Sequence, residues 1–190
     1  PFEVIRAAAT KPFGFMPFYP GPGLGGHCIP IDPLYLSWKL RTLKYQARFI
    51  DLADTINSSM PAYVVERVSD ALNSQKKPLN GSKILIYGVA YKRDVDDMRE
   101  SPAFSVMHDL AQRGAELSYM DPHVPSFDED GMKMSSVDPK SSFAGYDCVV
   151  IITDHLKLER ARLLAEAKLV VDTRDALRGV EGDRSKVYGL

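Results

Sequence analysis

The chain has 190 residues, and its 24 Lys and Arg nearly balance its 25 Asp and Glu. This charge balance gives no support to a nucleic-acid partner, and no apolar run approaches the roughly 20 residues of a membrane span. The two cysteines, Cys28 and Cys148, are too far apart in sequence to suggest a disulfide framework, and no signal peptide opens the chain. We therefore expect a cytoplasmic globular protein.

The N-terminal part reads as mainly helical. Residues 1–10 carry a short helical pattern, and because the chain begins at Pro1 without a methionine we expect a piece of a longer protein. A Phe-, Gly- and Pro-rich segment follows, and helical spacing of apolar residues then dominates residues 34–73. Pro61 either starts a helix or kinks a longer one. The polar stretch 73–82 reads as a linker.

From about residue 80 to the end, the pattern alternates between strand and helix. This alternation predicts an α/β fold, in which a helical segment is followed by a Rossmann-like, doubly wound parallel sheet. We divide the chain into residues 1–78, with the cysteine loop and the helices, and residues 79–190, with the sheet. The expected strands lie within 82–91, 115–122, 146–154 and 168–175, and the expected helices within 100–114 and 155–167.

The stretch FYPGPGLGGHCIPIDP (18–33) invites two interpretations. Gly21, Gly23 and Gly26 satisfy the dinucleotide pattern G-x-G-x-x-G, but no strand precedes them and Pro30 disfavours a helix starting within the motif. The alternative is a constrained loop that holds the thiol of Cys28 as a nucleophile. A third interpretation of Cys28 is a free cysteine that packs within the protein and has no chemical role. We expect this packing role for Cys148.

Three separated stretches carry a family resemblance. GPGLGGHCIPID (21–32) resembles the catalytic-cysteine loop of the UDP-glucose/GDP-mannose dehydrogenase family, and GVAYKRDVDDMRESPA (88–103) and VVDTRD (170–175) resemble two further hallmarks of that family. The cysteine loop is most similar to the branch that acts on UDP-N-acetylhexosamines. The resemblance implies a central helical domain that dimerises and a C-terminal UDP-binding domain, with an N-terminal NAD-binding domain outside this chain.

The resemblance also implies a reaction. Family members oxidise a sugar C6 alcohol to an acid with two NAD, through a thiohemiacetal and a thioester on the cysteine. By motif position the nucleophile is Cys28, and Asp32 matches an aspartate that positions or deprotonates water. Without the motif, Asp32 reads equally well as a turn residue. The expected product is a uronic acid, made from UDP-N-acetylglucosamine for surface polysaccharide synthesis.

Other residues of the expected site are binding residues. Lys92 matches a lysine that contacts the sugar, Arg99 an arginine that reaches the cofactor, and Arg174 an arginine at the nucleotide. A solvated loop, with its cations neutralised by neighbouring aspartates, is the alternative for the first two. The remaining expected substrate-binding residues precede Cys28 and are Phe18, Tyr19, Gly23, Gly25 and Gly26. For the two aromatic residues, packing within the protein is nearly as good an interpretation.

The expected partners are a UDP-sugar and a second copy of the chain, bound through the central helices. The scattered histidines and cysteines give no metal-ligand spacing, so no metal is expected. The UDP-glucose branch supplies an arginine across the dimer, and the nearest cation here is Lys11. Alternatives are UDP-glucose or UDP-N-acetylmannosamine as substrate, a cysteine acyl-transferase or hydrolase, and a nucleotide-sugar-binding and dimerisation module without catalysis.

Overall fold

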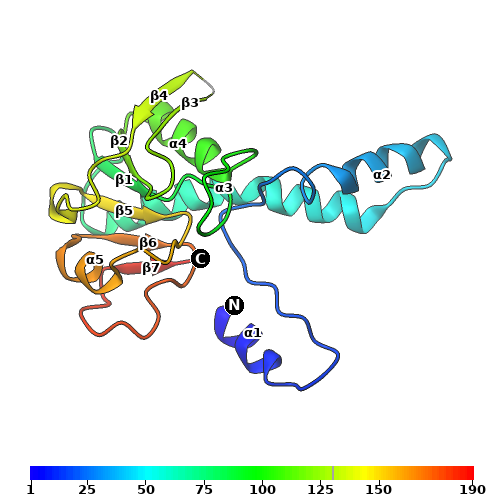
Figure 1. Cartoon of the computed structure of the whole chain (residues 1–190), viewed down its shortest axis with the longest axis horizontal. Coiled ribbons are helices and arrows are strands. Elements are labelled where there is room, and N and C mark those ends of the chain that lie inside the picture. Colours follow the sequence, from blue (N-terminus) through cyan, green and yellow to red (C-terminus); the bar gives the residue numbers. More distant parts are fainter. Residues whose placement is uncertain (130) are drawn as a thin grey trace.

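A five-stranded parallel sheet lies at the centre of the C-terminal part of the chain (Figure 1). The structure is a computed structural model and describes residues 1–129 and 131–190. From β1 the chain winds to β2 on one side and then returns to β5 on the other, which is the doubly wound pattern that the sequence predicted. In spatial order the strands are β2 (Glu116–Met120), β1 (Lys83–Tyr87), β5 (Cys148–Ile151), β6 (Val170–Asp172) and β7 (Val187–Gly189).

Apolar side chains cover both faces of this sheet. Successive residues of a strand point to opposite faces, so Ile84 and Ile86 join one core cluster while Leu85 and Tyr87 join the other. Two buried layers of this kind require helices on both sides. One face carries α3 (Arg48–Ser74) and α4 (Pro102–Gln112), and the other carries α5 (Arg160–Glu166) and the short 3-10 helix η1 (Phe143–Gly145).

The predicted elements of this layer are present, with three differences. Ser101 caps α4 by accepting from the N–H of Ala103, as the sequence predicted. The helix expected from residue 155 begins only at Arg160, because the backbone before it turns to donate the N–H of Leu156 to the Asp94 carboxylate. Strand β7 and a hairpin of β3 (Ser126–Glu129) and β4 (Met132–Ser135) were not predicted.

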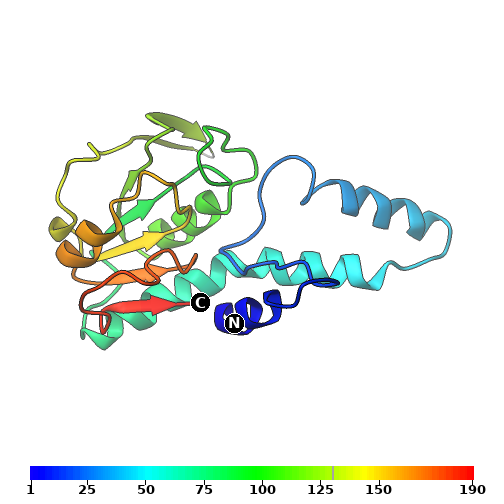
Figure 2. The ribbon, with the colours of Figure 1, turned by 60° about the horizontal axis from the view of Figure 1, so that its bottom comes forward.

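The helical segment consists of α2 (Asp32–Thr42) and the 27-residue α3. Pro61 lies inside α3 and does not start a helix, and the helix continues through it. The C-terminal half of α3 is buried against the sheet through Val64, Val68 and Leu72. Its N-terminal half projects away from the sheet beside α2 (Figures 1 and 2).

The N-terminal helix α1 (Phe2–Ala9) stands apart from α2 and from the projecting half of α3, at the end of an extended segment (Figure 1). The side chain of Arg6 forms an ion pair with Asp175, which follows β6, and so ties α1 to the sheet domain. None of the described helices combines the length and hydrophobicity that crossing a bilayer requires.

Candidate active site at the cysteine loop

Cys28 lies in a turn that leads directly into α2. Its thiol is free and the residue is exposed, whereas Cys148 is buried in the sheet, where burial raises the pKa of its thiol to about 12. The carbonyl of Cys28 accepts the N–H groups of Ile31 at 3.1 Å and Asp32 at 2.8 Å. Asp32 is the first residue of α2, where a carboxylate interacts favourably with the helix dipole. The two residues expected from the sequence to act in catalysis therefore share one tight turn.

The glycines before Cys28 allow its loop to dock on the loop that follows β1. The N–H of Gly26 donates to the carbonyl of Arg99 at 2.9 Å. A Cβ on Gly25 would lie 2.7 Å from both the carbonyl oxygen of Glu100 and the Cβ of Tyr91, closer than such atoms approach. Glycine has no Cβ and so permits such a close approach, and what these glycines approach here is the protein itself.

Arg99 shares the β1–α4 loop with Lys92 but has its own counter-ion. Its guanidinium contacts the Asp97 carboxylate at 2.6 Å, and this bond lowers the pKa of Asp97 to about 2 and raises the pKa of Arg99. Arg99 therefore fits the alternative interpretation, in which neighbouring aspartates neutralise the cations of a solvated loop. Lys92 is exposed, with its Nζ 5.2 Å from the centre of the Tyr91 ring, and pairs with no carboxylate among the described residues.

Arg174 lies between the sheet edge and the start of the cysteine loop. A Cβ on Gly21 would lie 2.2 Å from Nη1 of Arg174, so the guanidinium would have to shift if this residue carried a side chain. The Nε of Arg174 lies 3.6 Å from the Asp154 carboxylate, which also pairs with Arg93. Asp154 thus lies beside two cations at the edge, and its hydrogen bond is to Arg93.

Two carboxylates at this edge of the sheet, Asp154 and Asp121, were not predicted from the sequence. Burial alone would raise the pKa of Asp121, but hydrogen bonds from His155 and from the backbone N–H groups of Val89 and His123 lower it. Asp121 therefore ties together the turns after β1, β2 and β5. The signal available in the sequence was position: both aspartates end a predicted strand, at the edge where such sheets bind ligands.

A pocket of about 1000 Å³ opens beside the cysteine loop. His27, Ile29 and Arg99 line it together with the first half of α3 and the start of α4, but Cys28, Lys92 and Arg174 do not. The predicted site residues therefore do not share one closed cavity in this chain.

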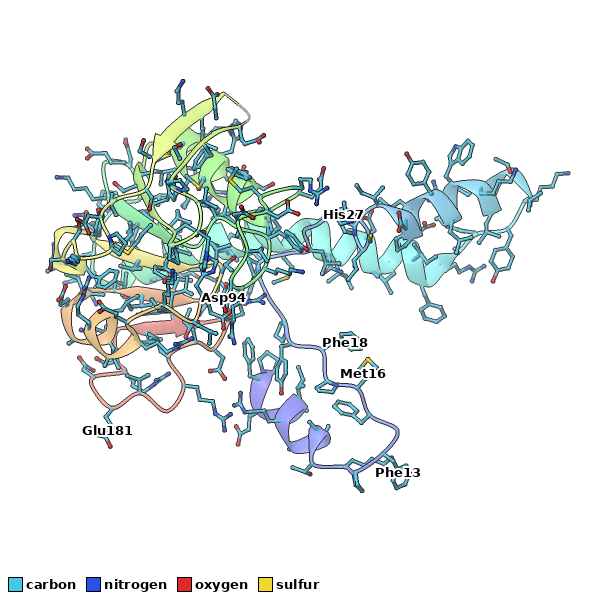
Figure 3. All side chains as sticks on the ribbon, viewed as in Figure 1. Phe13, Met16, Phe18, His27, Asp94 and Glu181 are labelled. Carbon is cyan, nitrogen blue, oxygen red and sulfur yellow. The ribbon has the colours of Figure 1, made fainter. Side chains whose placement is uncertain are left out.

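The two aromatic residues expected at the substrate lie apart from the thiol. Phe18 is 75% exposed on the extended segment and lies well apart from His27 (Figure 3). Tyr19 stacks on Phe2 of α1, with ring centres 6.2 Å apart. The structure does not bring either ring to the cysteine, and their role at the substrate stays a prediction.

The described residues do not fit a dinucleotide cradle. Gly21, Gly23 and Gly26 lie in an irregular loop, with no strand before them and a helix that begins only at Asp32. The turn after β1 contains Gly88 but no further glycine before α4. This agrees with the interpretation made from the sequence.

Comparison with known proteins identifies both parts of the chain. Residues 1–59 match the central domain of the UDP-glucose/GDP-mannose dehydrogenase family, and residues 85–179 match the UDP-binding domain of the same family. Over 136 residues the chain is 42% identical to a UDP-N-acetyl-D-mannosamine dehydrogenase of Methanococcus maripaludis, covering 72% of this chain and 29% of that protein. Over 175 residues it is 31% identical to a UDP-N-acetyl-D-glucosamine 6-dehydrogenase of Pseudomonas aeruginosa, covering 88% and 40%.

Solved structures agree with these matches. A UDP-D-ManNAc dehydrogenase from Pyrococcus horikoshii superposes with a TM-score of 0.82 at 27% identity, over 99% of this chain and 43% of that one. A UDP-glucose dehydrogenase from Pyrobaculum islandicum gives 0.78 at 26%, with the same coverage. The chain thus spans less than half the length of these relatives, and it belongs to the UDP-glucose/GDP-mannose dehydrogenase family.

Proposed function

We propose that this chain is the cysteine-bearing and UDP-binding part of an NAD-dependent UDP-N-acetylhexosamine 6-dehydrogenase, with UDP-N-acetylglucosamine as the first substrate to test. The observation that carries the proposal is the docking of the Cys28 loop on the carboxyl edge of the sheet, with Arg174 packed beside Gly21. Residues 1–78 would supply the thiol and the dimerising helices, and residues 79–190 the UDP-sugar site.

In the proposed reaction Cys28 holds the intermediate. The C6 alcohol would first be oxidised to an aldehyde, to which the Cys28 sulfur adds to give a thiohemiacetal. The thiohemiacetal is oxidised to a thioester, and water then cleaves the C–S bond to release the acid and the thiol. Bound NAD would accept one hydride in each oxidation, and a domain outside this chain would hold it. Asp32, in the same turn as Cys28, would position or deprotonate the water.

The cations at the sheet edge would bind the charged part of the substrate. Arg174, which lies beside Asp154, would bind the nucleotide, since a guanidinium makes strong paired bonds to phosphate oxygens. Lys92, which has no counter-ion among the described residues, would contact the sugar. Arg99 would leave Asp97 and contact the cofactor when the NAD-binding domain outside this chain brings the cofactor to it.

The same proposal includes a homodimer through α2 and α3. Trp38 is 64% exposed, Phe49 88% and Leu52 54%, all on the part of the helical pair that projects from the sheet (Figure 2). Exposed apolar groups at this density mark an interaction surface, and a second copy would bury the same groups of both chains.

A panel of UDP-sugars tests the proposal. The full-length dehydrogenase containing this chain should reduce two NAD per molecule of UDP-N-acetylglucosamine or its manno epimer, and UDP-glucose should be a much poorer substrate. Reduction with UDP-glucose alone would move the substrate to the other branch of the family. Rapid thiol labelling of Cys28 without UDP protection, together with no NAD reduction, would favour a cysteine acyl-transferase or hydrolase instead.

A further inference from the structure

Three side chains with metal-ligating atoms meet where β1, β2 and β5 end. Asp94 follows β1, His123 follows β2 and His155 follows β5. The Asp94 Oδ1 lies 3.6 Å from Nε2 of His123 and 3.7 Å from Nδ1 of His155. Each of the three residues offers one ligand atom within 4.8 Å of the ligand atoms of the other two. These residues are scattered in the sequence, and this is why no metal site was expected from it.

The spacing of the three atoms suits a small tetrahedral ion. Zinc bonds to nitrogen and carboxylate oxygen are about 2.0–2.2 Å long, which places neighbouring ligand atoms about 3.3–3.5 Å apart in a tetrahedron. The two distances from Asp94 exceed that range by only a few tenths of an ångström. Two imidazoles and one carboxylate, with a fourth position left to water, form a recognised zinc ligand set.

His155 is already oriented as a metal ligand would be. Its side chain is fully buried, and its Nε2 bonds to the Asp121 carboxylate at 3.1 Å. This bond places the ring proton on Nε2 and leaves the lone pair of Nδ1 available, and a carboxylate behind a histidine is the usual support of a metal-bound imidazole. At present Nδ1 accepts the N–H of Asp94 at 2.9 Å, and an ion would replace that bond.

One ring nitrogen of His123 has an environment that the hydrogen bonds of the protein do not explain. Its Nε2 is buried and has no hydrogen-bond partner among the described residues, although it faces the Asp94 carboxylate. A buried ring nitrogen without a partner is costly. A metal ion would give this nitrogen a partner, and so would a proton on His123, which is the rival explanation. Asp94 Oδ1 already accepts the N–H of Leu156 at 2.9 Å and has a second lone pair for an ion.

We infer that Asp94, His123 and His155 bind one divalent first-row transition-metal ion, with Zn²⁺ the best fit. The site lies at the edge of β1 and β5, where the strand order reverses and where doubly wound sheets bind their ligands. A bound ion would tie the loop that carries Lys92 and Arg99 to the turn after β2. The inference concerns a site outside the proposed chemistry and does not depend on that activity.

Cobalt titration of this chain tests the inference, because Co²⁺ in a tetrahedral site gives intense visible bands. The protein should carry Cys28→Ser, which removes the exposed thiol as a competing ligand. We expect saturation at one Co²⁺ per chain, displacement by Zn²⁺, and a rise in the Tm with either ion. His123→Ala should lower the affinity at least tenfold, whereas His108→Ala, an exposed histidine of α4, should change nothing.

Two results would overturn the inference. One is the absence of visible bands and of any metal-dependent rise in the Tm, which would leave a protonated His123 paired with Asp94 as the explanation of the cluster. The other is saturable binding that is equally strong in His123→Ala and His108→Ala, which would place the ion elsewhere. Melting without metal verifies that both variants fold, and none of these readouts requires NAD or a UDP-sugar.

Discussion

Single charges on the loop after β1 decide whether its arginine is available to a ligand. Arg99 bonds the Asp97 carboxylate through its Nε and Nη2 atoms, while Lys92 in the same loop stays unpaired with any described carboxylate. The sequence predicted both cations at the edge of the sheet where ligands bind. Pairing with neighbouring aspartates was the alternative prediction. Which aspartate pairs with which cation could not be predicted, because it depends on the turn that the loop adopts.

The Asp97–Arg99 pair gives a testable pH dependence. The pKa of Asp97 is lowered from 3.8 to about 2 by the bond to Arg99, so the pair is intact above about pH 4 and is lost as the pH falls towards 2. Arg99→Ala should return the pKa of Asp97 towards 3.8, measured by NMR titration of the carboxyl carbon. Arg93→Ala, which breaks the pair with Asp154 instead, should leave it unchanged. An unaltered Asp97 titration in Arg99→Ala would contradict the pairing.

The absence of a side chain at Gly25 positions the cysteine loop. Gly25→Ala places a Cβ 2.7 Å from the Glu100 carbonyl, so the loop must move, at a cost of about 1–3 kcal/mol in the free energy of unfolding. Gly145→Ala is the control, since its Cβ would meet nothing within 4 Å. Urea unfolding of both variants measures the difference. Equal stability would show that the loop does not depend on this contact.

The strands and helices that were predicted correctly are those marked by a local pattern of apolar or capping residues. The four strands of apolar residues and α4, with its Ser101 cap, lie where expected. Strand β7 was missed because it is three residues long, and its residues are only partly buried or exposed. The late start of α5 follows from the bond between Leu156 and Asp94, a contact across 62 positions that no local pattern contains.

The projecting half of the helical pair should be the dimer interface. Phe49→Asp places a charge on a surface where the native ring is 88% exposed, and burying that charge in a dimer would cost several kcal/mol. Sedimentation of this chain at micromolar concentration should show dimer for the native protein and monomer for the variant. Leu156→Asp, at a similarly exposed leucine after β5, should remain dimeric. A native chain that sediments only as monomer would contradict the interface.

For the whole molecule, the three family stretches come together although they are far apart in sequence. The cysteine loop docks on residues 91–102 and its first glycine on Arg174. The sequence predicted these stretches through a resemblance, and only folding shows that they share one edge of the sheet. The position of Asp121 at the end of a predicted strand was visible in the sequence. Its grouping with Asp94, His123 and His155 was not, because the four residues come from three separate turns.

The chain alone should bind UDP without oxidising a UDP-sugar. The sheet edge supplies Arg174 and Lys92, whereas the described residues form no dinucleotide cradle. Calorimetry with UDP should therefore give a saturable heat, and Arg174→Ala should weaken binding about tenfold or more. NAD with UDP-N-acetylglucosamine should give no absorbance of reduced cofactor. Sustained NAD reduction by the pure chain would show that the cofactor site lies within it.

The central claim is that Cys28 carries the covalent intermediate, and acid formation by the Cys28→Ser variant of the full-length dehydrogenase tests it most directly. A hydroxyl in place of the thiol should leave the affinity for the UDP-sugar within about twofold, because the sheet-edge cations are untouched, and should stop production of the uronic acid. The measurement is acid released per enzyme over time, followed chromatographically alongside a Cys148→Ser control. No acid above background from Cys28→Ser is the predicted result, and acid formation at the native rate would contradict the account.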